Sequence, residues 1–450
     1  MLSKRKAREI LEDAIRTSPA DETEVILSGG KTFSTRFTNN YISQNGAQKE
    51  YDIAVRVAFG QQVGVASCNI FDGDNLKQVV ENACTAARHS KPDLEWTPVL
   101  EAREVPELED AYLDSTIDYT PEEKAERLAP VLKRSIERGL TSAGMLVNGD
   151  NMLAVMNSRG LFGYQSWTGA SFTYTAMAPD QGSAWAEYHS HDLRELEVEA
   201  LADQAMERAD LARHPVATTP GAYTVVLAPT AVIELVEFLN YLGFGGQGYS
   251  EGTTFTSGKM GEQLFHPGIS LIDDPSRREV LGPSFDYEGH PKQRLALIDK
   301  GTISNIVYDR RTARKAGAQS TGHALMPPAT SGPFPTNIIL EAGDTRIDDM
   351  VANTERGIYV TRFWYSNVVD PKQAIITGMT RDGTFLIEDG KLSKPLRNMR
   401  YNQSLLKAFA NVEAIGDRIY GFNGYFGKLA VPALKIRDFV FSSVSEESPS

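Results

Sequence analysis

The second half of the sequence constrains the fold most, because its apolar runs are too short for helices and are separated by turn-forming residues. Runs such as "NIILEAG", "GIYVTRFWY" and "AIITGMTRDGTFLIEDGKL" are bounded by Gly, Pro, Asp and Asn. Arg381-Asp382-Gly383 and Glu388-Asp389-Gly390 are typical of turns between paired strands. Residues 222–443 are therefore predicted to form a mostly antiparallel β domain, either a sandwich or a closed barrel.

The first half shows a different pattern, in which helices alternate with strands. Residues 2–17 have the apolar spacing of an amphipathic helix. Thr120, Pro121 and Glu123 form the signature of a capped helix start, with proline at the first helical position. Residues 193–210 are predicted to form a further helix.

Strands are expected between these helices. Residues 142–178 are interpreted as four short strands, with turns at 148–150 and 158–160. Strands followed by a helix occur near 23–88 and again near 141–210. This order suggests an internal duplication, although the residue identities do not repeat.

The two patterns meet at "ARHPVATTPGAY", residues 212–223, which has the composition of a linker. We therefore expect an α+β protein with two domains. The N-terminal domain, residues 1–215, would contain mixed sheets with helices, and residues 222–443 would form the β-rich domain. The polar tail, residues 444–450, is expected to be disordered.

Composition and charge narrow the possible functions. The 450 residues carry a formal net charge of −13, which opposes binding to nucleic-acid phosphates. No apolar stretch approaches the roughly 18 residues of a membrane span. The N-terminus lacks the apolar core of a signal peptide, and two cysteines make no disulfide framework. These features predict a cytoplasmic protein that binds neither nucleic acid nor membrane.

An apolar helix followed by a glycine-rich segment occupies residues 231–263, "AVIELVEFLNYLGFGGQGYSEGTTFTSGKMGEQ", and this combination often frames an active site. Glu234 and Glu237 lie three residues apart on the helix and could bind a cation or act in acid–base catalysis. A solvent-exposed helix face is the simpler interpretation. The apolar residues of this helix nevertheless need cover, which a second subunit could provide.

The glycine-rich segment lacks the Gly-Lys-Ser/Thr ending of a phosphate loop. We interpret Gly245 and Gly246 as part of a loop over a groove or of a turn-rich edge. Because glycines lower the barrier to backbone motion, residues 243–258 are predicted to be among the most mobile of the chain.

The histidines offer no obvious catalytic set. His189 and His191 would share one face of a strand, but two ligands are too few for a closed zinc site. His323 and His266 are isolated in loops, and nothing in the sequence pairs either with a nucleophile. His323 is kept as a candidate groove residue.

From residue 222 onward, the order of motifs resembles the TldD/TldE (PmbA) peptidase family, also called modulator of DNA gyrase. The family's Ser-Gly-x-x-Gly-Glu segment is matched by Ser257, Gly258, Gly261 and Glu262. Its other motifs are matched by Asp273, Asp274, Asp286, Glu288, Gly289, Gly301, Thr336 and Asn337. The resemblance implies a two-domain chain that dimerises around a central cavity.

The resemblance also implies which residues an active member needs. In the TldD type, the helix before the glycine-rich segment carries His-Glu-x-x-x-His, whose imidazoles bind zinc and whose Glu is the general base, and a C-terminal Cys completes the site. The TldE type lacks these residues and supports the active subunit. This sequence has no His between His214 and His266 and no Cys after Cys84, so it resembles the TldE type.

These departures lead us to expect a non-catalytic, TldE-like subunit of a cytoplasmic metallopeptidase that acts on peptides, with zinc only in a partner subunit. The partner would be a TldD-like paralogue or a second copy of the chain. Whether the chain is itself an enzyme stays open. One alternative is a homodimeric peptide-binding or regulatory protein without hydrolysis. Another is a hydrolase with an unconventional site, built from Glu234, Glu237, His323 or the acidic residues near 273 and 286.

Overall fold

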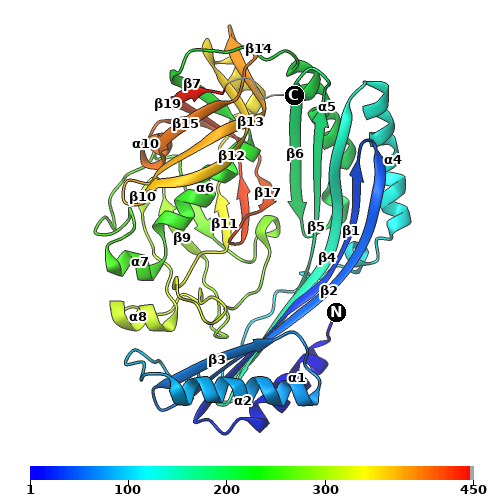
Figure 1. The fold of residues 1–450 in the computed structure, drawn as a ribbon. Coiled ribbons are helices and arrows are strands. Elements are labelled where there is room, and N and C mark those ends of the chain that lie inside the picture. The colour runs from blue at the N-terminus through cyan, green and yellow to red at the C-terminus, as the bar shows by residue number, and fades with distance from the viewer. Residues whose placement is uncertain (446–450) are drawn as a thin grey trace.

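The computed structural model describes residues 1–445, and its N-terminal part is built around one long, curved sheet (Figure 1). The elements of this part are α1 Lys4–Thr17, β1 Glu22–Thr38, β2 Tyr41–Phe59, β3 Gln62–Cys68, α2 Gly73–His89, α3 Asp114–Ile117, α4 Pro121–Glu137, β4 Thr141–Asn157, β5 Phe162–Met177, β6 Ser183–Ser190, the 3₁₀ helix η1 Leu193–Glu195 and α5 Val198–Leu211. The six strands lie in the order β3-β2-β1-β4-β5-β6, and every pairing is antiparallel.

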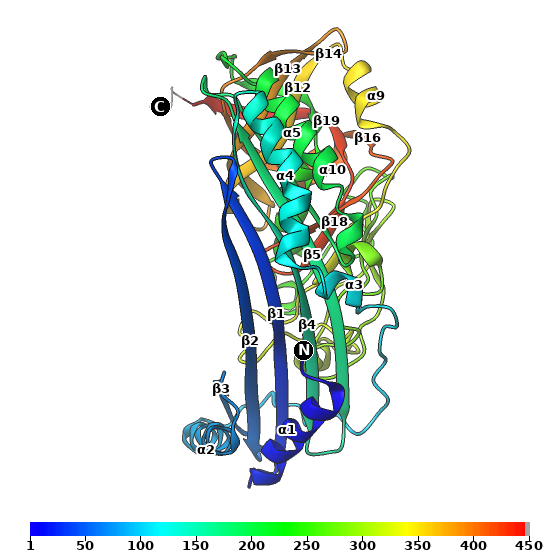
Figure 2. The ribbon, with the colours of Figure 1, turned by 90° about the vertical axis from the view of Figure 1, so that its right-hand side faces the viewer.

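The order helix, three strands, helix occurs twice along this sheet, which agrees with the predicted duplication. The two halves meet where β1 pairs with β4 at the centre. Helices α1 and α2 pack at one end of the long strands, and α4 and α5 pack at the other end (Figure 2). Each helix pair covers a separate hydrophobic core, because strands of this length extend beyond the reach of one pair.

The prediction of four short strands over residues 142–178 is wrong, because this region forms only β4 and β5. Residues 148–150 lie in the middle of β4, which pairs with β1 and β5 along its length. A Cβ at Gly149 would lie 2.4 Å from the carbonyl oxygen of Lys31, so this glycine permits close approach of two backbones instead of a turn. The turn predicted at 158–160 does connect β4 to β5.

The C-terminal part contains two sheets. Its elements are β7 Gly221–Leu227, α6 Pro229–Gly243, α7 Gly246–Glu251, β8 Leu271–Asp273, η2 Arg278–Val280, β9 Leu295–Asp299, β10 Thr302–Ile303, α8 Arg310–Ala316, β11 Asn337–Leu340, α9 Ile347–Ala352, β12 Arg356–Asp370, β13 Ile375–Glu388, β14 Lys391–Pro395, β15 Met399–Ser404, α10 Leu405–Ala410, β16 Val412–Ile415, β17 Tyr420–Asn423, β18 Lys428–Val431 and β19 Leu434–Val444. One sheet has the order β10-β9-β8-β11-β18-β17.

The other sheet closes on itself. Strands β12, β7, β19, β15 and β13 are neighbours in that order, and β12 also pairs with β13. The five strands therefore form a closed barrel, which confirms that alternative of the prediction. Most pairings are antiparallel as expected, with β7–β12 and β11–β18 parallel.

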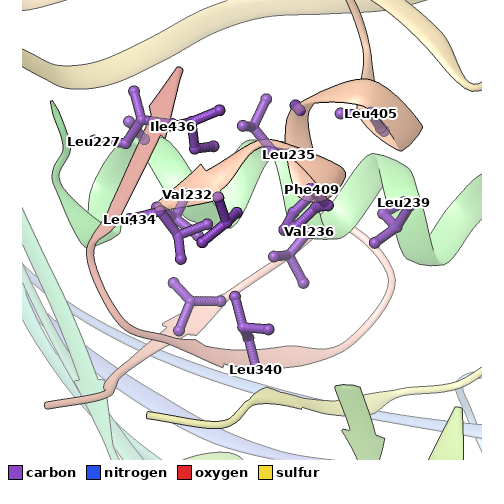
Figure 3. Close-up of a cluster of buried hydrophobic side chains, with 14 of the residues drawn as sticks. Leu227, Val232, Leu235, Val236, Leu239, Leu340, Leu405, Phe409, Leu434 and Ile436 are labelled. Carbon is purple, nitrogen blue, oxygen red and sulfur yellow. The ribbon is translucent and has the colours of Figure 1, made fainter. Parts of the chain in front are cut away.

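Helix α6 packs against the barrel within its own chain. Figure 3 shows its apolar side chains Val232, Leu235, Val236 and Leu239 facing Leu227, Phe409, Leu434 and Ile436. Ile233 and Phe238 are partly buried against the same core. These side chains therefore do not need the cover that a second subunit could provide, since strands far away in the sequence already cover them.

The first residues of the predicted tail and the predicted linker are more ordered than expected. Strand β19 extends to Val444, and the Ser445 N–H donates to the carbonyl oxygen of Asn398 at 2.7 Å, so a disordered tail does not begin at residue 444. The rest of that predicted tail, residues 446–450, lies outside the described residues. Within the linker, Val216 exchanges backbone hydrogen bonds with the segment 395–397. Of the helices in residues 1–445, none has the length and apolar character needed to cross a membrane.

Candidate functional site

The two glutamates of α6 lie on a covered face of the helix. Glu237 is 7% exposed, and its carboxylate accepts the backbone N–H of Tyr425 from the loop between β17 and β18. Burial raises the pKa of Glu237, the Tyr425 N–H opposes this shift, and the charge of Glu234 adds to it. Burial also raises the pKa of Glu234, which lies beside Ser366 of β12. The expectation of a solvent-exposed face is therefore wrong for both residues.

Aromatic rings lie beside the C-terminal end of α6. The rings of Tyr241 and Phe426 are stacked, with centroids 5.1 Å apart and planes 6° apart. Phe334 lies 5.1 Å from Phe426 and 6.4 Å from Tyr241. Tyr241 and Phe426 are each about half exposed. We call these three residues the aromatic cluster. Next to it, Glu237 fixes the loop at Tyr425, so this end of α6 presents apolar rings and a backbone-bonded carboxylate.

The glycine-rich segment is folded into a helix where the sequence suggested a loop. Gly245 is the N-cap of α7, and Gly246 donates its N–H to the carbonyl oxygen of Val307 at 2.9 Å. A Cβ at Gly246 would lie 2.6 Å from the ring of Tyr308, and one at Gly243 would lie 2.6 Å from the ring of Phe255. These two glycines therefore allow the backbone to pack closely against the neighbouring aromatic rings. The mobility of residues 243–258 stays a prediction.

The Ser-Gly-x-x-Gly-Glu motif forms turns along the edge of a sheet. The Ser257 hydroxyl donates to the carbonyl oxygen of Tyr249 at 3.1 Å. Gly258 and Gly261 have φ angles of 75° and 82°, which favour glycine, and a Cβ at either would meet no neighbouring atom within 4 Å. Glu262 is exposed. The motif thus shapes the backbone beside β10.

His323 is not isolated, contrary to the expectation from the sequence. Its imidazole is buried, with Nε2 3.2 Å from Asp273 Oδ1 and Nδ1 2.9 Å from Thr321 Oγ1. Asp273 Oδ2 accepts the backbone N–H groups of Thr336 and Asn337 at 2.8 and 3.0 Å. The sequence could not reveal this pair, because its members are 50 positions apart and no pattern links them.

A partly buried lysine completes this polar network. Lys292 Nζ donates to Thr336 Oγ1 at 2.6 Å and to Asn337 Oδ1 at 2.7 Å. Burial lowers the pKa of Lys292, while the charges of Asp273 and Asp286 oppose the shift. Burial pushes the pKa of Asp273 upward, but His323 and then Lys292 hold it below its usual value.

The network borders a cavity of about 210 Å³. Its lining includes the aromatic side chains of Trp167, Phe285, Tyr287, Phe334 and Phe426 and the polar side chains of Asp286, Lys292, His323, Thr336, Asn337 and Lys428. We call this cavity the lysine pocket. Because Phe334 and Phe426 belong to both, the pocket adjoins the aromatic cluster beside α6.

The Asp-x-Glu-Gly motif has a structural role that the sequence did not indicate. The Asp286 carboxylate accepts the backbone N–H groups of Glu288, His290 and Ala324, each at 2.9 Å. Burial, together with the charge of Glu288, raises the pKa of Asp286 to about 7. The Glu288 carboxylate is bound by Arg310 and, from the N-terminal sheet, by Arg56. The ion pairs of Glu288 therefore connect the N-terminal sheet with the C-terminal part of the chain.

The two histidines of β6 and the turn after it are buried without forming a metal centre. Neither ring nitrogen of His189 has a hydrogen-bond partner, and burial lowers its pKa well below the usual value. Asp192 caps η1, and its carboxylate accepts the Arg194 N–H at 3.0 Å. Within residues 1–445, no group of three or more His, Cys, Asp and Glu side chains is arranged to hold a metal ion.

The candidate residues predicted from the sequence therefore lie in several separate regions of the structure. Glu234 and Glu237 lie together on α6, Gly245 and Gly246 belong to α7, and Ser257 to Glu262 form turns beside β10. His323 lies in the lysine pocket. The structure adds Lys292 and Lys428, which sequence analysis missed because isolated lysines carry no motif.

Comparison with known families gives matches along most of the chain. Three models of the PmbA/TldA metallopeptidases match this chain. The model of domain 1 matches residues 23–87, that of the central domain matches residues 110–213, and that of the C-terminal domain matches residues 220–443. The region 1–215, which was expected to form one domain, thus spans two of these models.

Several curated proteins are similar in sequence. Metalloprotease PmbA of Escherichia coli O157:H7 is 24% identical over 458 residues, covering 95% of this chain and 96% of that protein. A metalloprotease of Methanothermobacter thermautotrophicus is 26% identical over 182 residues, covering 40% of this chain and 39% of that protein. A metalloprotease TldD homolog of Haemophilus influenzae is 29% identical over 222 residues, covering 48% and 45%. The matches to the latter two span less than half of those proteins.

Two solved structures share the fold. TldE from Thermococcus kodakarensis superposes with a TM-score of 0.86 at 20% identity, covering 97% of this chain and 99% of that one. A putative modulator of DNA gyrase from Thermotoga maritima gives a TM-score of 0.84 at 17% identity, covering 97% and 100%. The three family-model matches and the shared fold agree with the resemblance found in the sequence, and the chain therefore belongs to the PmbA/TldD metallopeptidase family.

Proposed function

We propose that this chain is a non-catalytic, TldE-like subunit of a two-subunit metallopeptidase that acts on peptides, with the zinc ion in the partner subunit. The main support is the surrounding of α6, the helix that carries the zinc ligands in the TldD type. Here Glu237 of that helix binds the Tyr425 backbone, and Tyr241 stacks on Phe426. In this chain, the side chains at the end of the helix therefore contact other parts of the protein, whereas in the TldD type this helix carries metal ligands.

The aromatic cluster also supports a role in holding peptides. Exposed aromatic rings offer large apolar contact areas to peptide side chains and lose little conformational entropy on binding. Tyr241 and Phe426 are both about half exposed, and Tyr425 beside them is 85% exposed. A subunit with such a surface beside its partner's zinc site would position a peptide without cleaving it.

Co-expression with a paralogue that carries His-Glu-x-x-x-His tests this proposal. We expect the two chains to co-elute in size-exclusion chromatography and to cleave an unfolded peptide only when both are present. Replacing the first His of the paralogue's motif with Ala should abolish cleavage and leave the complex intact. Cleavage by the isolated chain, or failure of the two chains to associate, would contradict the proposal.

A second candidate function is hydrolysis at an unconventional site, and one observation favours it. Thr336 Oγ1 lies 2.6 Å from Nζ of Lys292, whose pKa burial lowers, and such a contact can activate a hydroxyl nucleophile. Against it, Lys292 also donates to Asn337 Oδ1, and the Thr336 hydroxyl donates to the same oxygen at 3.0 Å. The isolated chain should then cleave peptides, and Thr336→Val should abolish this cleavage.

A further inference from the structure

One of the two lysines that line the lysine pocket, Lys428, lacks a negative partner among the described residues. Lys428 Nζ donates to the carbonyl oxygen of Leu281 at 2.7 Å, and it forms no ion pair with any of residues 1–445. Burial lowers the pKa of Lys428 to about 8. A partly buried ammonium group without a counter-ion is unfavourable, so an anion that entered the pocket would be stabilised there.

The carboxylates near the pocket are already engaged elsewhere. Asp286 accepts three backbone N–H groups, and Asp273 accepts two and lies against His323. Lys292 is held by the neutral oxygens of Thr336 and Asn337. Neither lysine therefore has a carboxylate bonded to its Nζ.

The side chains that line the pocket, and the size of the pocket, restrict which group a ligand can carry beside its anionic end. Five of its side chains are aromatic, so an apolar group fits between them. The volume of about 210 Å³ is smaller than the roughly 300–1,000 Å³ of small-molecule sites, which leaves room for about one residue. An apolar group with a carboxylate at its end matches both features.

We propose that the lysine pocket binds the C-terminal residue of a peptide, with an apolar side chain between the aromatic walls and the terminal carboxylate on Lys428. This inference rests on the proposed function, because it specifies which part of a peptide the subunit holds. Phe334 and Phe426 connect the pocket to the aromatic cluster, so the preceding residues of the peptide run past the end of α6.

Peptide binding to the isolated full-length chain tests the pocket without any cleavage step. The probe is a fluorescent pentapeptide, labelled at its N-terminus and ending in Phe, prepared as the free acid and as the C-terminal amide. Fluorescence anisotropy should show that the acid binds at least about tenfold more tightly than the amide. Lys428→Met should remove this difference, whereas Lys391→Met, at an exposed position of β14, should preserve it.

Three outcomes would overturn the pocket assignment. The first is binding of acid and amide within about twofold of each other, and the second is a preference for the acid that survives in Lys428→Met. The third is 3-phenylpropanoate alone binding as tightly as the peptide acid, which would assign the pocket to a free carboxylic acid. Competition by 3-phenylpropanoate at an affinity about tenfold weaker than the peptide supports the assignment.

These measurements can fail separately from the proposed function. The acid–amide comparison is made on the wild-type chain, so it does not depend on the folding of a variant. Loss of the acid preference would leave the association with a zinc-bearing paralogue untouched. Failure of that association would leave the pocket measurement untouched.

Discussion

Arg310 binds Glu288 through two hydrogen bonds, from Nε to Oε2 at 2.8 Å and from Nη2 to Oε1 at 3.2 Å, in a site where both side chains are at least 90% buried. Arg56 of β2 reaches the same carboxylate at 3.3 Å and also binds Glu24 of β1 at 2.6 Å. The carboxylate of Glu288 therefore connects the N-terminal sheet to the C-terminal part, and it must be charged to satisfy two guanidinium groups.

Replacing Glu288 with Gln should destabilise the protein strongly. The amide leaves Arg56 and Arg310 underpaired in a buried site, which typically costs about 3 kcal/mol or more. Urea unfolding should show a lower midpoint. Glu355→Gln, an exposed position before β12, is the matched control and should leave the midpoint unchanged. Equal midpoints for the Glu288 variant and the wild type would show that the network contributes nothing to stability.

The same carboxylate should make stability depend on pH. Although burial by itself raises the pKa of Glu288, Arg310 and Arg56 lower it from 4.5 to about 2. Because the folded-state pKa is depressed, the unfolded chain binds the proton first. The stabilisation is present above pH 4.5 and is lost as the pH falls from 4.5 towards 2. The difference in urea midpoint between wild type and Glu288→Gln should therefore shrink between pH 5 and pH 3. If the difference in urea midpoint stays constant between pH 5 and pH 3, the lowered pKa of Glu288 is contradicted.

Some of this fold could be predicted from local patterns. The short apolar runs after residue 222 indicated a mostly antiparallel β domain, with a closed barrel as one of two alternatives, because each strand carries its own turn signals. The cap at Thr120 was predicted correctly, with the Glu123 carboxylate accepting its N–H at 2.7 Å. These signals are local in sequence. By contrast, Gly149 resembles a turn residue in its local sequence but lies within a strand that pairs on both sides.

The candidate site depended on contacts that local patterns do not contain. Glu237 is buried because Tyr425, 188 residues later, donates to it. His323 meets Asp273, and Lys292 meets Asn337, only after β8 and β11 pair. The family motifs identified Asp273 and Asn337 as a pattern, but their partners and the lysine pocket followed only from the three-dimensional arrangement.

The chain should hold no stoichiometric zinc. Helix α6 has no imidazole, and the C-terminal part has no thiol, so the ligands of the TldD type are absent from the sequence. Elemental analysis of the purified chain after dialysis against a weak chelator should find zinc far below one ion per chain. About one tightly held zinc per chain would contradict the non-catalytic interpretation, since such a site needs about three protein ligands.

Glu237 should position the loop between β17 and β18. Leucine at this position removes the acceptor for the Tyr425 N–H, whereas glutamine keeps an oxygen there. Hydrogen exchange at residues 424–426 should therefore accelerate in Glu237→Leu and change little in Glu237→Gln. Equal exchange in both variants would show that the carboxylate does not hold the loop.

The final prediction separates a structural role of the two glutamates from a chemical one. Burial raises the pKa of both Glu234 and Glu237, and each lies beside backbone or hydroxyl groups of its own chain. Glutamine preserves their size and acceptor oxygens but cannot act as a base. The double substitution Glu234→Gln and Glu237→Gln should therefore leave cleavage by the mixture with a zinc-bearing paralogue nearly unchanged. Size-exclusion chromatography and circular dichroism would confirm assembly and fold. If cleavage disappears while both are intact, the glutamates take part in the chemistry, and a hydrolase with an unconventional site replaces the supporting subunit.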